Sequence, residues 1–321
     1  MPSKTGGSAL PLLATLGAMA GFQVGAACAK TLFPAIGPEG AAALRLCLGA
    51  AMLVAIGRPW RGWPRPAPLL PLFGLGAATA SAVTMFYLSQ SRLPLGVAVS
   101  LQFPGPLAVA VFGSRRLVDL VWAALAAGGV WCLVGAGASI AAVDPLGIAF
   151  ALCAAVAWAS YILCGRAASA AFGGATAALA SSIAAVLVLP FGVLQAGGAL
   201  LNPALLPIAL LMALLSTVIP FSLELYALPR LPARTFATFT SLEPAFGVVS
   251  GWVLLSQHLA PSQIAGVAVV IAAAAGAAWS SANRPAPPSL ADASRREGLG
   301  KAVAGGAIRG LNRGARGETQ S

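Results

Sequence analysis

Apolar residues fill most of this chain in long unbroken stretches, and polar residues gather in the short breaks between them. A run of about 20 apolar residues is long enough to cross the apolar core of a bilayer as a helix. The runs are continuous rather than alternating, which favours helices over the strands of a membrane barrel. The pattern therefore predicts an all-α polytopic membrane protein with ten transmembrane helices, at residues 9–29, 38–57, 67–89, 95–113, 117–136, 145–165, 174–195, 204–228, 232–255 and 260–281.

The first apolar run also has features of a signal peptide, because Lys4 precedes it as in a charged leader. We favour a retained first helix, because the same segment has a copy later in the chain. The tripeptide Arg-Leu-Pro at 92–94 recurs at 230–232, and Pro106 recurs as Pro244, both at an offset of 138 residues. The end of the first helix recurs in the sixth at an offset of 136.

Weak similarity between apolar halves is typical of transporters built from internal repeats, although chance similarity in an Ala-, Leu- and Gly-rich chain is the alternative. Each half would contain five helices, and an odd number forces the second copy to be inverted. The remaining C-terminal residues are rich in Gly, Ala, Pro and Arg and contain no span-length apolar run. We therefore expect one repeat at 1–140, a second at 141–282, and a disordered basic cytoplasmic tail at 283–321.

Composition strengthens the membrane assignment. The chain is 59% hydrophobic and only 8% charged, whereas soluble domains carry about 25% charged residues. A soluble enzyme is therefore excluded, and so is disorder over most of the length. The five cysteines all lie in apolar runs without a CxxC pair, which favours hydrophobic packing over disulfide bonds or metal binding.

The net charge of +11 could indicate nucleic-acid binding, but the placement of the charges favours another explanation. With ten spans and both termini in the cytoplasm, sixteen of the 19 Lys and Arg residues fall on the cytoplasmic side. Only Lys30 and Arg92 fall outside, and Arg45 lies within a span. This is a strong positive-inside bias. The charge thus reports topology and contact with anionic membrane lipids, not nucleic acid.

Polar groups inside a bilayer are costly, so the few that are present are the best candidates for function. Glu243 is predicted near the middle of the ninth helix, and Pro244 beside it breaks the backbone hydrogen bonding. A carboxylate next to a broken helix suits cation coordination or proton exchange, and the alternative is a structural bond to a neighbouring helix. Glu224 lies nearer the cytoplasmic end, where it could equally pair with Arg230 or Arg234.

Arg45 is predicted about seven residues from the outer end of the second helix. It could reach the interface, pair with Glu39, or bind a substrate carboxylate. In the fourth helix Gln102 lies near mid-membrane, followed by Pro104 and Pro106. This region is the repeat partner of the Glu243–Pro244 region, and two interrupted helices at matching positions are the best pointer to a transport site.

Gln23, near the middle of the first predicted helix, is a weaker candidate. Tyr87 and Tyr161 are also weaker, because aromatic residues near helix ends are more often interfacial anchors. The pairs Gly21-xxx-Gly25 and Gly247-xxx-Gly251 favour close helix packing within the protomer. The single histidine, His258, falls in an outer loop. The sequence contains no Walker A, HExxH, GxSxG or CxxC motif, so no ATP-driven pump or protease machinery is expected, and no metal or cofactor.

Several motifs in order along residues 10–280 carry a resemblance to a known family. They lie at 43–46, 94–99, 105–110, 114–116, 118–119, 161–163, 194–197, 222–224, 231–236 and 243–245. In these motifs the chain resembles the drug/metabolite transporter superfamily with two EamA-type repeats, and within it the threonine/homoserine exporter-like branch. Family members often carry glutamate at the position of Gln102, which would leave Glu243 as the main titratable group here.

The resemblance implies a multi-pass exporter in the bacterial inner membrane, with both termini cytoplasmic. Its substrates would be small neutral amino acids such as threonine or homoserine, exchanged for protons. The alternatives are an exporter of the same fold for another small metabolite or drug, and an undriven membrane channel or structural subunit. An enzyme is not expected, because one loop histidine supplies no nucleophile–base pair or metal set.

Overall fold

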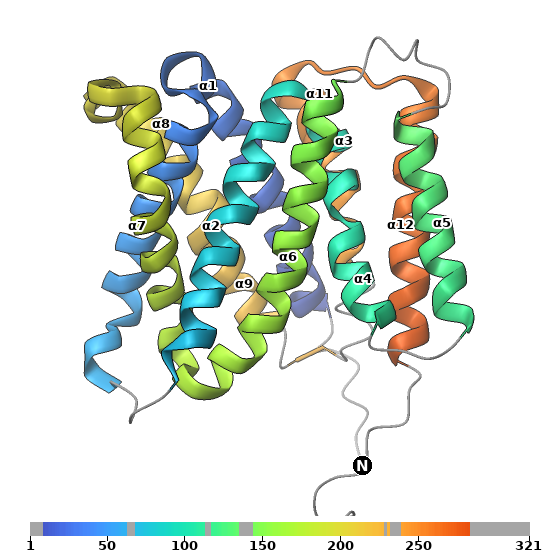
Figure 1. Cartoon of the computed structure of the whole chain (residues 1–321), viewed down its shortest axis with the longest axis horizontal. Coiled ribbons are helices and arrows are strands. Elements are labelled where there is room, and N and C mark those ends of the chain that lie inside the picture. The colour runs from blue at the N-terminus through green and yellow to red at the C-terminus, as the bar shows by residue number, and fades with distance from the viewer. Residues whose placement is uncertain are drawn as a thin grey trace, which may run out of the picture. The chain divides into compact units, whose positions relative to one another are not determined.

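The computed structural model describes residues 9–62, 68–112, 117–134, 144–227, 230–231 and 239–282, and within them all regular structure is helical (Figure 1). The predicted tail and the predicted repeat boundary near residue 140 lie outside this range. The main helices are α1 (Ala9–Gly57), α2 (Leu69–Arg92), α3 (Leu95–Gln102), α4 (Pro104–Phe112), α5 (Leu117–Val134), α6 (Pro145–Phe172), α7 (Thr176–Ala196), α8 (Leu206–Ala213), α9 (Ile219–Ala227), α11 (Glu243–Leu255) and α12 (Pro261–Ala282).

The first two predicted helices form the two arms of α1, which fold back on each other at Gly37 (Figure 1). Gly37 has φ 69 and ψ 171, a combination that residues with a Cβ rarely adopt. Pro34 and Pro38 flank it and remove two helical hydrogen-bond donors. The break therefore falls where the sequence predicts the second helix to begin.

Two of the predicted helices are interrupted. The predicted helix 95–113 is divided into α3 and α4 at Phe103, whose N–H bonds to Ser100 in a tight turn. The predicted helix 232–255 is described only from 239, and a turn at 241–242 precedes α11. The two interruptions lie at matching positions in the predicted repeats, as the prolines indicate.

These interruptions correct two details of the prediction. Glu243 is the first residue of α11, not a residue well inside a continuous helix. The first break comes before Pro104, so Pro106 lies in the opening turn of α4, where proline is tolerated because the N–H groups there lack helical partners.

The predicted helix 204–228 contains α8 and α9, joined by the π-helical segment η6 (Leu214–Val218). A π turn shifts the backbone bonding from i→i+4 to i→i+5 and often occurs at functional sites. Gly25 of α1 packs directly on this segment, since a Cβ at Gly25 would lie 2.7 Å from the Cβ of Ser216. Close packing at the Gly21-xxx-Gly25 pair is thereby confirmed, with Gly21 against the carbonyl of Leu215.

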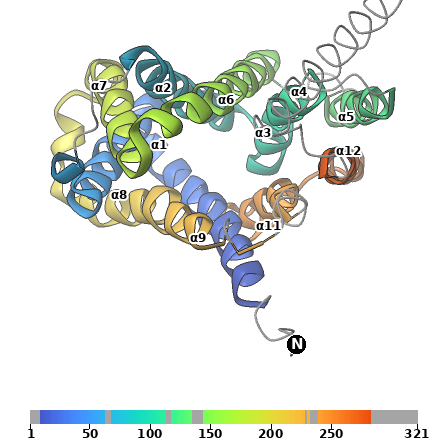
Figure 2. The ribbon, with the colours of Figure 1, turned by 90° about the horizontal axis from the view of Figure 1, so that it is seen from below.

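Helix α1 lies at the centre of the helices that position the site. It packs against α2, α7, α8, α9, η6 and α11, as the view along the bundle shows (Figure 2). The interrupted helices α3 and α11 also pack on each other, where Gly96 lies against Val248 and Gly247 against Val99. The second predicted glycine pair thus also brings helices of this chain close together.

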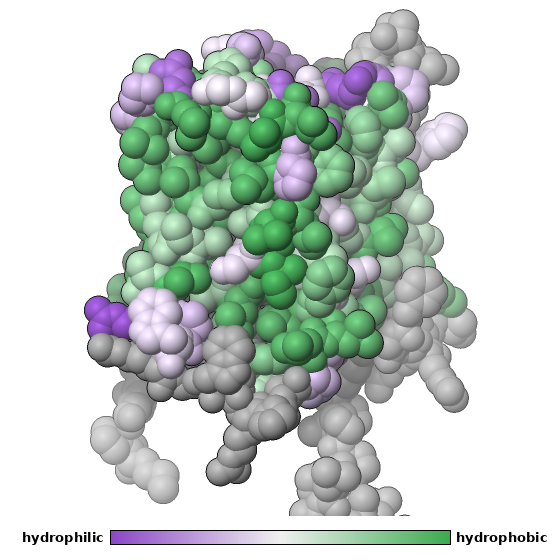
Figure 3. All heavy atoms as spheres, turned by 60° about the vertical axis from the view of Figure 1, so that its left-hand side comes forward, coloured by the Kyte–Doolittle hydropathy of each residue, from purple (hydrophilic) through white to green (hydrophobic). Residues whose placement is uncertain are grey.

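The outer surface of the helices is apolar, as a membrane protein requires. Figure 3 shows an apolar band with polar residues above and below it. Among the described residues four stretches are long and apolar enough to cross a membrane: Leu10–Gly57, Leu69–Arg92, Pro145–Leu201 and Pro261–Ser280. Shorter apolar helices accompany them, and the count of ten crossings in two inverted repeats stays a prediction.

Candidate functional site

Gln23 and Glu243, 220 residues apart in sequence, meet between α1 and the start of α11. The amide Nε2 of Gln23 donates a hydrogen bond to Oε1 of Glu243 at 2.9 Å, and the Gln23 side chain is only 2% exposed. The first turn of a helix carries backbone N–H groups without helical partners, and its dipole favours negative charge. The start of α11 is therefore a suitable place for a carboxylate away from water.

Arg45 lies in the second arm of α1 and directs its guanidinium into the bundle. Nη1 donates to the hydroxyl of Tyr87 at 3.3 Å, and Nη2 donates to the backbone carbonyl of Ser216 at 3.0 Å. The guanidinium carbon is 5.6 Å from the centre of the Tyr87 ring. The two alternatives of an interfacial Arg45 and of a pair with Glu39 are wrong, because the side chain is buried and bound elsewhere.

Tyr87, one of the weaker site candidates, is completely buried on α2, which excludes the alternative of an interfacial anchor. Its ring packs against Phe33 with a centroid separation of 5.6 Å. A buried phenol needs a polar partner for its hydroxyl, and Arg45 supplies it. We call Gln23, Arg45, Tyr87, Ser216 and Glu243 the central polar cluster.

The central polar cluster contains one basic and one acidic side chain, Arg45 and Glu243. Each is hydrogen-bonded to uncharged partners: Glu243 to Gln23, and Arg45 to Tyr87 and to the carbonyl of Ser216. Two buried polar atoms of the cluster, Nε of Arg45 and Oε1 of Gln23, have no protein partner. A buried donor or acceptor without a partner costs about 1–3 kcal/mol. The cluster therefore contains one donor and one acceptor that the described protein groups leave unused.

Gln102 and Tyr161 belong to a different group of contacts. The Oε1 of Gln102 accepts a hydrogen bond from Nε1 of Trp158 at 3.1 Å, and the rings of Trp158 and Tyr161 meet edge to face at 5.1 Å. Gln102 ends α3 directly before the interruption, as predicted for a polar residue next to a broken helix. Trp158 joins it to α6.

The other predicted site residues are placed by the backbone. Glu224 lies on α9, and its side chain falls outside the described residues. Pro104 is the first residue of α4, and Pro244 is the second residue of α11. His258 lies in the connection between α11 and α12, as predicted. Among the described residues no group of three or more His, Cys, Asp or Glu side chains could hold a metal ion.

The sequence analysis missed Ser216 and Gln90. Ser216 takes part through its carbonyl oxygen, at a π turn that has no sequence signature. Gln90 is 0% exposed on α2, where its Nε2 donates to the carbonyl of Ala26 at 2.7 Å. Gln90 was missed because the predicted helix ends at residue 89, whereas α2 continues to Arg92 and buries the amide.

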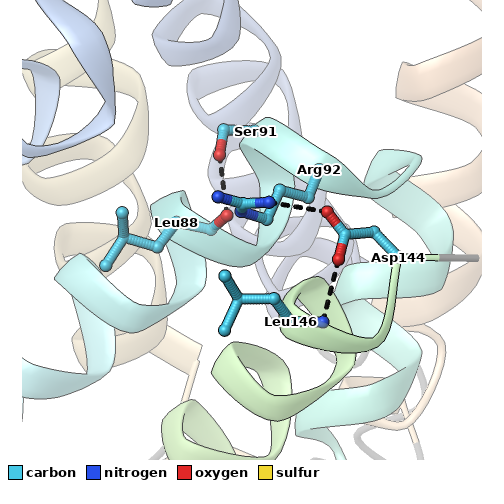
Figure 4. Close-up of polar contacts among 5 residues, drawn as sticks. All are labelled: Leu88, Ser91, Arg92, Asp144 and Leu146. Carbon is cyan, nitrogen blue, oxygen red and sulfur yellow. Dashed lines mark hydrogen bonds and ion pairs between the residues drawn. The ribbon is translucent and has the colours of Figure 1, made fainter.

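A second polar group lies at the end of the bundle where α2 meets α6. Arg92 reaches from the last turn of α2 to Asp144, which caps α6, and Nη1 and Oδ2 are 2.7 Å apart (Figure 4). The other oxygen of Asp144 accepts from the N–H of Leu146 at 2.9 Å. The hydrogen bond from Arg92, and then that from Leu146, hold the pKa of Asp144 below its ordinary value. This pair shows that Arg92 and Asp144 lie at the same end of the bundle.

Further contacts tie the turn between α2 and α3 to other helices at this end. Lys30 of α1 donates to the carbonyl of Leu93 at 2.8 Å. The side chain of Gln257, after α11, accepts from the N–H of Leu95 at 2.8 Å. The turn at 92–95 is thus connected to α1, to α6 and to the link between α11 and α12.

A bundle of apolar helices with interrupted helices beside a cluster of polar and ionisable side chains is typical of a membrane transporter. Residues 145–279 match the model of the EamA-like transporter family. The threonine/homoserine exporter RhtA of Escherichia coli (strain K12) is 48% identical over 267 residues, which cover 83% of this chain and 90% of the relative. RhtA of Salmonella typhimurium (strain LT2) is 47% identical over the same length.

The chain belongs to the EamA-like transporter family. A solved crystal structure of a protein 19% identical to it superposes with a TM-score of 0.55 and covers 83% of this chain and 96% of that one. That likeness extends the fold assignment over most of the described helices. The protein is therefore a transmembrane transporter of EamA type.

Proposed function

We propose that the protein is a secondary-active exporter of small neutral amino acids of the threonine and homoserine kind, which it exchanges for protons. It would act in the bacterial inner membrane, with ten helices in two inverted repeats and both termini in the cytoplasm. The relatives named as threonine/homoserine exporters support the substrate class. The observation that carries the proposal is the placement of one buried basic side chain, Arg45, and one partly buried acidic side chain, Glu243, each hydrogen-bonded to a residue of the other predicted half.

The two charges complement an amino-acid zwitterion. The substrate carboxylate would bind the guanidinium of Arg45, whose Nε has no protein partner. The substrate ammonium would bind Glu243, with Oε1 of Gln23 as a neutral acceptor beside it. Tyr87 would hold Arg45 in place through its hydroxyl. Small neutral side chains suit such a site, because an additional charge on the substrate would have no buried counter-charge among the described residues of the cluster.

Proton exchange follows from competition for Glu243. A proton and a substrate ammonium cannot both occupy the same carboxylate, so binding of one requires release of the other. Substrate bound from the cytoplasm would leave on the outer side, where a proton would replace it on Glu243. The protonated carrier would then return and release its proton inside. The interruptions before α4 and α11 would let the two halves move relative to each other.

The test is reconstitution of the purified protein in liposomes with radiolabelled threonine and homoserine. We expect saturable transport that is accelerated by a pH gradient and is directed against the proton flux. Saturable transport that a pH gradient leaves unchanged would contradict proton antiport. Non-saturable flux would indicate an undriven channel, and transport of other metabolites in place of these amino acids would overturn the substrate class.

A further inference from the structure

Gln90 is a completely buried amide whose donor end is bonded and whose acceptor end is not. Its Nε2 donates to the carbonyl of Ala26, while its Oε1 has no hydrogen-bond partner. The assignment of the two ends is fixed by this contact, because a carbonyl can only accept. A strong acceptor therefore remains without a protein partner in a completely buried position, on the helix that also carries Tyr87.

The first arm of α1 and helix α2 pair in a regular register beside the central polar cluster. Ala26 contacts Gln90, and about one turn further along both helices Lys30 contacts Leu93. The two residue numbers differ by 64 in the first pair and by 63 in the second, so the register is nearly the same at both contacts. The same register places Gln23 level with Tyr87. Gln90 then lies three residues, or about 4.5 Å along the helix axis, beyond the level of Gln23 and Tyr87, and Tyr87 is hydrogen-bonded to Arg45.

Besides the hydroxyls of Thr84 and Ser89, the buried side-chain atoms without a partner among the described residues include three that lie at two levels along α1 and α2. At the level of Tyr87 there are a guanidinium donor, Nε of Arg45, and an acceptor, Oε1 of Gln23. One turn away there is a second acceptor, Oε1 of Gln90. In an amino acid with a terminal hydroxyl, the carboxylate and ammonium are separated from that hydroxyl by about 4 Å of aliphatic chain. The order and the spacing match such a molecule.

We infer that Gln90 recognises the side-chain hydroxyl of the transported amino acid through its Oε1. The inference rests on the proposed function, since it places the α-carboxylate at Arg45 and the α-ammonium at Glu243. A site built to hydrogen-bond a hydroxyl discriminates strongly against the analogue without it, because the buried acceptor is then left unpaired. Gln90 thereby determines specificity for hydroxylated over purely aliphatic amino acids.

The test compares homoserine with norvaline, its isostere in which a methyl group replaces the hydroxyl. Initial transport rates are measured in proteoliposomes at subsaturating concentration for the native protein, Gln90→Met and Ser89→Ala. Methionine has nearly the shape of glutamine and lacks its acceptor. Ser89 is equally buried on α2 with an unpaired hydroxyl, but it faces a different direction, so it is the matched control.

We expect the native protein and Ser89→Ala to prefer homoserine, and Gln90→Met to lose that preference by about tenfold or more while it still transports norvaline. Equal rates for the two amino acids in the native protein would overturn the inference without any variant. An equal loss for both in Gln90→Met would also overturn it, because Gln90 would then only connect α2 to α1. Transport of neither amino acid by the native protein would instead refute the proposed function.

Discussion

The central polar cluster and the Arg92–Asp144 pair use the same kinds of contact in opposite surroundings. Both join segments far apart in sequence through hydrogen bonds of ordinary length, 2.7–3.3 Å. The side chains of Arg92 and Asp144 are 41% and 35% exposed, whereas Arg45 and Gln23 are buried. Because water competes for exposed charges, the outer pair contributes little to stability. Water cannot replace the partner of a buried polar group, so the loss of that partner affects both folding and function.

The largest effect should follow Glu243→Gln, which keeps the size and the bond to Gln23 possible but removes the charge. We expect transport driven by a pH gradient to fall by about tenfold or more, because neither a proton nor an ammonium group can bind there as before. The loss is measured as the rate of transport in proteoliposomes that contain equal amounts of each protein. Glu39→Gln, at the kink of α1, is the matched control and should retain transport. Unchanged transport in Glu243→Gln would remove this residue from the mechanism.

Arg45→Lys tests the guanidinium while it keeps the charge. Lysine cannot replace the two separate bonds to Tyr87 and to the carbonyl of Ser216, so we expect a loss of substrate affinity of about tenfold, equivalent to about 1.4 kcal/mol. The concentration dependence of transport gives the apparent affinity. Arg166→Lys on the exposed side of α6 serves for comparison. An equal substrate affinity in Arg45→Lys and Arg166→Lys would show that the two separate bonds of the Arg45 guanidinium are not needed.

Gly105→Ala tests the packing beside the first interruption. A Cβ at Gly105 would collide with the backbone carbonyl of Ala155 in α6, which cannot rotate away. We expect a loss of stability of about 1–3 kcal/mol, seen as a lower unfolding temperature in detergent. The control is Gly128→Ala in α5, where a Cβ would meet no atom within 4 Å and a helical alanine should be neutral or stabilising. Equal stability of the two variants would contradict close packing at Gly105.

The smallest effect should follow Asp144→Asn at the outer pair. At neutral pH we expect a change in unfolding temperature close to the error of the measurement, because both partners are exposed. The pKa of Asp144 is lowered in the folded protein, so its contribution is present above the ordinary aspartate pKa of about 4 and is lost as the pH falls through the folded value. Melting curves of both proteins from neutral to acidic pH should therefore converge. A large difference at pH 7 would show that this pair matters more than its exposure indicates.

Much of the fold could be read from local patterns. Apolar runs marked the helices, the gap between the runs 9–29 and 38–57 marked the reversal in α1, and the prolines at 104 and 244 marked the two interruptions. These features act over a few residues, so they are visible along the chain. The predicted position of Glu243 within its helix was wrong. A helix that starts beside a proline and a helix that continues through the proline can have the same local sequence, so the sequence does not distinguish them.

The sequence by itself determined the class of protein, because too few charges remain to cover a soluble surface, and it selected the rare polar residues on which transport can depend. The tertiary structure decided which of them act together. It brought Gln23 to Glu243 and Arg45 to Tyr87, separated Gln102 and Trp158 as another pair, and added Ser216 and Gln90. The physical reason is that a buried hydrogen bond depends on how distant helices pack, and that packing is a property of the whole bundle.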